Sequence, residues 1–133
     1  MKRLIVMMLC FVLLATVTFS QSSKTDVYVA NRNAGKSVAL TFDDGPHAEY
    51  TPKILEILKK YNARATFFVI GKNAKEHPEI VKQTFLEGHE IGNHTYSHPK
   101  MNSINSEKVI DEIQKTSQII EEITGQKPML FRS

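Results

Sequence analysis

Short apolar runs alternate with amphipathic segments along this 133-residue chain, and this alternation limits the fold more than any other feature. Buried-type strands are predicted over 38–42, 65–70, 89–91 and 129–131, and helices are predicted to begin at Thr51, Pro78 and Ser106. Strands joined by helices of this length run parallel, because each helical crossover brings the chain back to start the next strand in the same direction. The sequence therefore predicts an α/β fold with a parallel sheet. Four strands and three helices are too few to close a (β/α) barrel, so we expect a domain that is cut short.

The predicted helices carry apolar residues at helical spacing, which indicates the face that each turns inward. Thr51 is expected to cap the first helix, with Pro52 at its first position, and Ser106 is expected to cap the third. Gly88 and Gly125 are expected to end the second and third helices. The residues expected to face inward are Ile54, Leu55, Leu58 and Tyr61, then Ile80, Val81, Phe85 and Leu86, then Val109, Ile110, Ile113, Ile120 and Ile123.

The first 20 residues have the pattern of an export signal. Lys2 and Arg3 precede an apolar run over 4–19, and a cut after Ser20 would leave a polar linker over 21–36 and a domain over 37–133. The run is shorter than the roughly 20 residues that span a bilayer, so an uncleaved anchor is the alternative. We therefore expect an extracytoplasmic protein, secreted or associated with the cell wall, which contacts a membrane only through this segment if it stays uncleaved.

Charge and cysteine content exclude several classes of function. The net charge is +3, two of the basic residues lie in the export-type segment, and the others are scattered, so no nucleic-acid partner is expected. Cys10 is the only cysteine and lies in the same segment. An internal disulfide, a cysteine-ligated zinc and a thiol nucleophile are therefore excluded from the mature chain.

Chemically capable side chains follow three of the predicted strands, and the carboxyl ends of parallel strands meet at one edge of a sheet. Asp43 and Asp44 follow the first strand, His94 and His98 the third, and Arg132 the fourth. Two imidazoles four residues apart can share one ion if the segment makes a helical turn, although such a pair is also common as a surface or structural feature. The other histidines, His47, His77 and His89, are read as loop or structural residues.

The paired carboxylates are consistent with a cation at this edge, although Asp, Gly and Pro are also ordinary turn formers. Adjacent carboxylates repel each other without a cation, so an ion would take one as a ligand and leave the other free as a base. Two imidazoles and one carboxylate leave coordination positions open, which is typical of a catalytic metal. Thr95 follows the first histidine where zinc proteases have glutamate, which excludes their chemistry.

Three segments resemble the first three motifs of the polysaccharide deacetylases, the NodB homology domain of carbohydrate esterase family 4. They are Thr-Phe-Asp-Asp-Gly-Pro at 41–46, His-Thr-Tyr-Ser-His-Pro at 94–99 and Leu-Phe-Arg at 130–132. The likeness runs over 37–133, and it implies the N-terminal portion of a distorted (β/α) barrel. The family's third motif continues past Arg132, and its later motifs are expected but not seen, so the resemblance implies an incomplete domain.

The resemblance also implies an activity and its residues. It implies hydrolysis of the acetamide of N-acetylated sugars, with zinc or another divalent ion bound by Asp44, His94 and His98. Asp43 would act as general base and Arg132 would orient it. This agrees with the chemistry, because an ion that polarises the carbonyl and lowers the pKa of water toward ~7 makes a poor electrophile reactive. No residue is assigned to protonate the leaving amine.

Three hypotheses therefore remain open. The first is metal-dependent N-deacetylation of an N-acetylated polysaccharide, with peptidoglycan N-acetylglucosamine as the first substrate and chitin oligomers as the second. The alternative is an inactive, truncated remnant that binds carbohydrate. A third reads the two histidines and one carboxylate as the triad of a non-haem iron oxygenase, against which the parallel-strand pattern speaks.

Overall fold

The computed structural model describes residues 35–133. The predicted export signal over 1–20 and the predicted linker up to residue 34 lie outside the described residues. Residues Lys36–Ser133 make up one compact unit. Among the described residues, no helix combines the length and apolar character needed to cross a bilayer.

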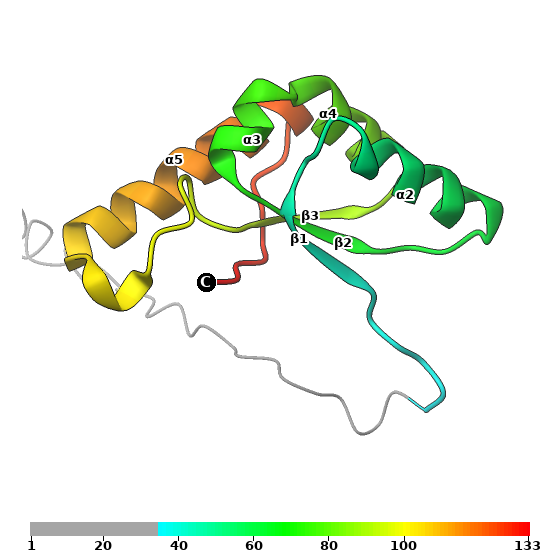
Figure 1. The fold of residues 1–133 in the computed structure, drawn as a ribbon, viewed down its shortest axis with the longest axis horizontal. Helices are drawn as coiled ribbons and strands as arrows, with labels where there is room; N and C mark the ends of the chain where they lie inside the picture. The colour runs from blue at the N-terminus through cyan, green and yellow to red at the C-terminus, as the bar shows by residue number, and fades with distance from the viewer. Residues whose placement is uncertain (1–34) are drawn as a thin grey trace, which may run out of the picture. The chain divides into compact units, whose positions relative to one another are not determined.

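A three-stranded parallel sheet organises this unit, with strands in the order β1 (Thr41–Gly45), β2 (Thr66–Val69) and β3 (Glu90–Asn93). Helix α2 (Tyr50–Lys60) connects β1 to β2, and α3 (Gly71–Glu76) with α4 (Pro78–Leu86) connects β2 to β3. A short 3-10 helix, η1 (Met101–Ser103), and the long helix α5 (Ser106–Thr124) follow. Figure 1 shows the helices on one side of the sheet. The predicted α/β fold with parallel strands is confirmed.

The core lies between the sheet and these helices. It combines residues of the strands with residues of α2, α4 and α5, among them Leu55, Leu58, Phe67, Val69, Val81, Ile91 and Ile120. Burying an aliphatic or aromatic side chain of this size contributes about 1.5–3 kcal/mol. The β-branched and aromatic residues of 66–69 fit a strand that is covered by helices, because they pack well on a pleated surface.

Helix α5 packs with a mixed polar and apolar stripe that its apolar periodicity did not predict. Glu112, Thr116, Ile120 and Thr124 are its buried residues, spaced four apart. The two threonine hydroxyls donate to the carbonyls of the preceding turn, at 3.0 Å for Thr116 and 2.7 Å for Thr124, so neither is buried without a partner. Ile110, which was expected to face inward, is 52% exposed. The predicted inward face of this helix was therefore wrong in part.

Several boundaries differ from the sequence prediction, and both helix caps differ because of local hydrogen bonds that were not anticipated. The first strand begins at Thr41, and Val38 is 93% exposed. Thr51 does not cap α2, since its buried hydroxyl accepts the N–H of His47 instead. The cap of α5 is Asn105, whose Oδ1 accepts the N–H of Lys108 at 2.9 Å. Helix α3 was not predicted at all. Gly125 ends α5 in the left-handed conformation, as expected.

Other differences concern burial and the last predicted strand. Tyr61 and Leu86, both expected inward, are each 70% exposed. Residues 129–131 do not form a strand, and a single parallel bridge joins Phe131 to Asn93. In that bridge the Asn93 N–H donates to the Leu130 carbonyl at 2.8 Å and the Arg132 N–H donates to the Asn93 carbonyl at 3.0 Å. This bridge still brings Arg132 to the edge where β3 ends.

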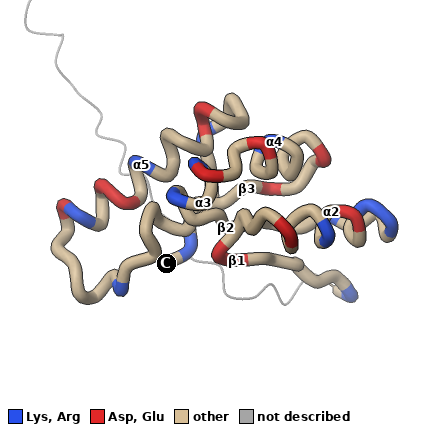
Figure 2. Tube along the Cα trace, turned by 45° about the horizontal axis from the view of Figure 1, so that its top comes forward, with Lys and Arg blue, Asp and Glu red and all other residues tan. Residues whose placement is uncertain are grey.

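Charged residues of both signs are interspersed along α2, α4 and α5 in the described part of the chain (Figure 2). On α5, for example, Lys108 pairs with Asp111 at 2.8 Å. The hydrogen bond and charge of Asp111 raise the pKa of Lys108, and those of Lys108 lower the pKa of Asp111. Pairs that are this exposed contribute little to stability.

Candidate metal centre

Three side chains that could bind a metal converge where β1 and β3 end. Asp44, His94 and His98 each offer one ligand atom, and these atoms lie within 4.8 Å of one another. The Oδ1 atom of Asp44 lies 3.5 Å from Nε2 of His94 and 3.7 Å from Nε2 of His98. The structure therefore brings together the carboxylate and the two imidazoles that the sequence placed on different strand ends.

Asp44 reaches the centre because β1 is irregular at its end. The pairing of β1 with β2 shifts register between Phe42 and Gly45, and Asp44 lies in the left-handed region with φ of 67°. Aspartate tolerates this conformation better than most residues. The side chain of Asn73, at the start of the β2–β3 connection, donates to the Asp44 carbonyl at 2.9 Å and holds this turn.

His94 is fixed on both sides. It directly follows β3, only 4% of it is exposed, and its backbone N–H donates to the Val69 carbonyl at 3.0 Å. Its Nδ1 lies 2.8 Å from the Arg132 carbonyl oxygen. Because a carbonyl only accepts, Nδ1 carries the proton, and Nε2 is the ring atom that faces Asp44. Metal-binding histidines are oriented by this kind of hydrogen bond.

His98 is placed by a loop, so the two imidazoles meet without the helical turn that their four-residue spacing would otherwise need. Thr95 and His98 both have positive φ, 65° and 54°. Positive φ is unusual for a β-branched or bulky residue, and each residue held in such a backbone conformation costs about 1–3 kcal/mol. The rings of His94 and His98 still come within 4.7 Å, centre to centre. The four-residue spacing was thus a sound indication of proximity, although its geometric reason differs.

Two buried polar residues support this loop, and sequence reasoning missed both. Asn93 is 2% exposed and its Oδ1 accepts the N–H of Thr95 at 2.8 Å. Glu112, on α5, is 1% exposed and accepts three hydrogen bonds from Tyr96 and Ser97. Burial alone would raise the pKa of Glu112, but these hydrogen bonds outweigh it and hold the pKa below its ordinary value. The four-residue spacing of Glu112 from Thr116, and of Thr116 from Ile120, is the sequence signal that could have indicated that Glu112 is buried.

Asp43 directly precedes Asp44 in the chain, and its side chain is held by Arg132. The guanidinium Nη1 donates to Asp43 Oδ1 at 2.8 Å and to the Thr41 hydroxyl at 3.1 Å. The Cζ atom of Arg132 also lies 4.2 Å from the centre of the Phe68 ring, and this contact confines the Arg132 side chain. The Arg132 and Asp43 side chains are 41% and 36% exposed, so the pair contributes only about 0–1 kcal/mol to stability. The hydrogen bond limits the positions that the Asp43 carboxylate can take.

The donor set fits a divalent ion. Two imidazole nitrogens and one carboxylate oxygen are borderline ligands that suit zinc and similar metals. Ligands about 2.1 Å from a tetrahedral ion lie about 3.4 Å apart, close to the separations of Asp44 from the two histidines. Three protein ligands leave open positions for water and a substrate oxygen. The arrangement can therefore support hydrolysis at a polarised carbonyl.

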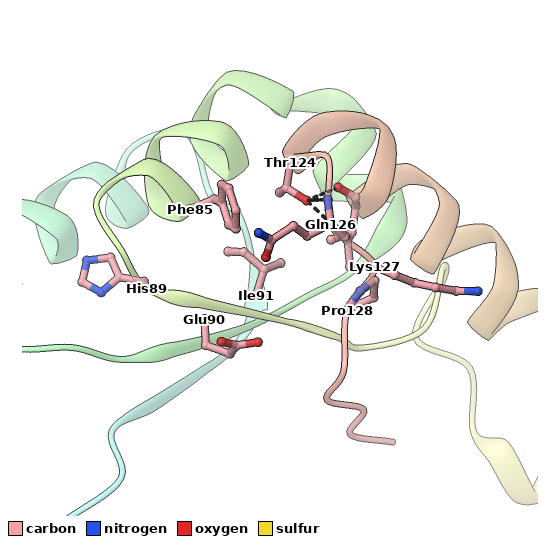
Figure 3. A pocket seen from close by; sticks show the side chains of 9 residues that line it. Phe85, His89, Glu90, Ile91, Thr124, Gln126, Lys127 and Pro128 are labelled. Carbon is pink, nitrogen blue, oxygen red and sulfur yellow. Dashed lines mark hydrogen bonds between the residues drawn. The ribbon is translucent and has the colours of Figure 1, made fainter. Parts of the chain in front are cut away.

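The small pocket in Figure 3 is separate from this centre. It lies beside β3 and the end of α5, and Phe85, His89, Ile91 and Thr124 are among the residues that line it. Burial, and secondly the charge of Arg64, lowers the pKa of His89. Neutral His89 can then accept the Ala65 N–H through Nδ1, at 3.4 Å. This contact agrees with the structural role expected for His89.

Comparison with known proteins identifies one family. The model of the family described as polysaccharide deacetylase matches residues 30–133. A peptidoglycan-N-acetylglucosamine deacetylase of Bacillus cereus is 52% identical over 95 residues, which are 71% of this chain and 34% of that protein. The peptidoglycan-N-acetylmuramic acid deacetylase PdaC of Bacillus subtilis is 44% identical over 97 residues, 73% of this chain and 21% of PdaC.

A solved structure gives the same result. The Bc1960 peptidoglycan N-acetylglucosamine deacetylase superposes with a TM-score of 0.70 at 51% identity, over 71% of this chain and 44% of that one. The chain thus spans about a third of the length of the Bacillus cereus relative and less than half of the solved chain. The family match over residues 30–133 includes the sheet, the helices and the candidate centre.

Proposed function

The chain belongs to the polysaccharide deacetylase family, and on that premise we propose that it hydrolyses the N-acetyl group of amino-sugar polymers with the help of a divalent metal. The first candidate substrate is the N-acetylglucosamine of peptidoglycan, and the second is chitin oligomers. The observation that carries the proposal is the grouping of the ligand atoms of Asp44, His94 and His98 within 4.8 Å of one another. We propose that 37–133 is an incomplete deacetylase domain.

Asp44, His94 and His98 would hold the ion, with zinc as the first candidate. When bound, such an ion supplies a Lewis acid for the acetamide carbonyl and makes a nearby water more acidic. The Nδ1–H of His94 donates a hydrogen bond to the Arg132 carbonyl, which keeps Nε2 directed at the ion site. The exposed faces of Asp44 and His98 leave this site open to a large polymer from the solvent.

Asp43 would take the proton of the attacking water. The water oxygen then bonds to the acetamide carbon, the carbon–nitrogen bond breaks, and acetate leaves with a free sugar amine that gains a proton. Arg132 keeps Asp43 aimed through the 2.8 Å hydrogen bond. A general base in this position accelerates a reaction by about 10² to 10⁴. We assign no residue of 35–133 to the protonation of the amine.

We further propose that the protein works outside the cytoplasm, where the Met1–Ser20 segment would deliver it. The names of its relatives support this, because peptidoglycan is a polymer of the cell wall. Secretion after a cut behind Ser20 is the first expectation, and anchoring by an uncleaved segment is the alternative. A reporter fused to 1–20 that stays in the cytoplasm would contradict this placement.

Acetate release from N-acetylglucosamine oligomers and from peptidoglycan, with and without zinc, tests the activity. The assay uses this chain and any longer product of its gene. Asp43→Asn should keep zinc but lose turnover by about 10² to 10⁴, whereas Asp111→Asn, an exposed change on α5, should leave both unchanged. Loss of zinc in Asp43→Asn would overturn the division of roles between the two aspartates. Polymer binding without acetate release would favour the carbohydrate-binding alternative.

A further inference from the structure

A buried carboxylate from α5 closes the loop that carries His98. The Glu112 Oε2 atom accepts the N–H of Tyr96 at 2.9 Å and the N–H of Ser97 at 2.7 Å. Its Oε1 accepts the hydroxyl of Ser97 at 2.9 Å. Glu112 is 1% exposed, so these bonds lie away from competing water. The loop and the helix are thereby joined by three hydrogen bonds to one side chain.

The shape of the loop explains why an anion is needed there. Two successive backbone N–H groups that point to one place form a concavity that binds anions. In this chain the concavity is filled by a carboxylate 15 and 16 residues further along the sequence. Thr95 and His98, on either side of these N–H groups, have positive φ, which the local sequence does not favour. The loop therefore depends on contacts from outside itself.

The two histidines of the centre differ in how they are held. The His94 ring is buried and its Nδ1 bonds to the Arg132 carbonyl. The His98 side chain is 52% exposed, and within the described residues no hydrogen bond joins its ring to the backbone. His98 directly follows Ser97, whose N–H and hydroxyl both bind Glu112. The position of the His98 ring is therefore set by its backbone. The His98 N–H donates to the Thr95 hydroxyl at 3.2 Å, and Glu112 binds the backbone of the two residues between Thr95 and His98.

We propose that Glu112 is a positioning residue that holds the Tyr96–Ser97 turn so that His98 can reach an ion shared with Asp44 and His94. This inference rests on the proposed function. Glu112 touches neither the ion site nor a substrate, and it acts through the loop. It follows that Glu112 controls one of the two imidazole ligands and leaves the other in place.

Substitutions at Glu112 test the first part of this proposal through zinc affinity, measured by competition with a chromogenic chelator on the whole chain. Glu112→Met keeps the length but removes both acceptors, and it should weaken zinc binding about 10- to 100-fold. Glu112→Gln keeps a carbonyl for the two N–H groups and an amide for the Ser97 hydroxyl, so it should lose less than about fivefold. Glu121→Met, on the exposed face of the same helix, is the matched control and should bind as the wild type does.

Nitrogen-15 spectra of labelled histidine test whether the effect passes through His98. In the wild type, saturating zinc should shift the Nε2 signals of both His94 and His98. In Glu112→Met only the His94 signal should shift. Shifts of both signals, or of neither, would overturn the inference. If Glu112→Met does not unfold cooperatively in urea, Glu112→Asp replaces it, because the shorter side chain keeps the charge but withdraws the acceptors.

The outcome also separates this inference from the proposed function. A wild-type chain in which zinc shifts neither histidine would refute the metal centre itself. A wild-type chain in which zinc shifts both, with a Glu112→Met variant that binds zinc equally well, would refute only the role of Glu112.

Discussion

Asn93→Ala should destabilise the protein strongly for a change of one small side chain. Asn93 ends β3, is 2% exposed, and joins the loop after it to α5. Its Oδ1 accepts the Thr95 N–H at 2.8 Å, and its Nδ2 donates to the Ile113 carbonyl at 2.8 Å and the Ser117 hydroxyl at 2.9 Å. Alanine removes all three bonds.

The expected loss of stability follows from the polar groups that Asn93→Ala leaves without a hydrogen-bond partner. The N–H of Thr95 belongs to a residue that is 2% exposed, and an unpaired buried donor costs about 1–3 kcal/mol. The two bonds to α5 add about 0.5–1.5 kcal/mol each, reduced because the oxygen of the half-buried Ser117 can accept from water instead. We expect a loss of about 2–4 kcal/mol in the free energy of unfolding.

Urea unfolding of the metal-free chain, followed by circular dichroism, measures this loss. The midpoint should fall with an unchanged slope, since the surface exposed on unfolding is the same. Asn102→Ala is the matched control, because Asn102 is exposed and such changes stay within about 0.5 kcal/mol. An Asn93→Ala variant as stable as this control would refute the reasoning that links β3 to α5.

Two further predictions concern the packing around β3. In Gly92→Ala the new Cβ would meet the Phe68 ring at 2.5 Å, so urea unfolding should show a loss of about 1–3 kcal/mol, and wild-type stability would contradict this. The pKa of His89 is lowered by burial and by Arg64, so its contribution to stability is present above its unfolded value of 6.5 and is lost as the pH falls below it. The stability advantage of the wild type over His89→Gln should therefore shrink from pH 7.5 to 5.5, and a constant difference would be evidence against a neutral, buried His89.

The sequence allowed the fold class and the edge of the site to be predicted because both depend on short-range pattern. Alternating apolar runs and helices predict a parallel sheet, and a parallel sheet places the residues after each strand at one edge. Asp44 and His94 come together for that reason. Arg132 reaches Asp43 even though 129–131 is not a strand, because one bridge to Asn93 is enough to place it.

The rest depends on contacts that no local pattern contains. Glu112 is a charged residue, and charged residues on a helix usually face the solvent. Its burial is explained only by the Tyr96–Ser97 loop, which packs against α5 in the folded structure. The apolar periodicity predicted that Ile110 faces inward. The helix instead buries Thr116 and Thr124, whose hydroxyls donate to backbone carbonyls of the preceding turn. Thr95 and His98 have positive φ in a loop that bonds to Asn93 and Glu112, whereas the sequence indicated only that a helical turn could bring the two histidines together.

The central claim is that one divalent ion is held by Asp44, His94 and His98, and zinc K-edge X-ray absorption of the zinc-loaded chain tests it most directly. The account predicts one zinc per chain, with two imidazole nitrogens and oxygen ligands at about 2.0–2.2 Å, and loss of imidazole scattering in His94→Ala. Zinc bound without imidazole, or bound identically in His94→Ala, would contradict it.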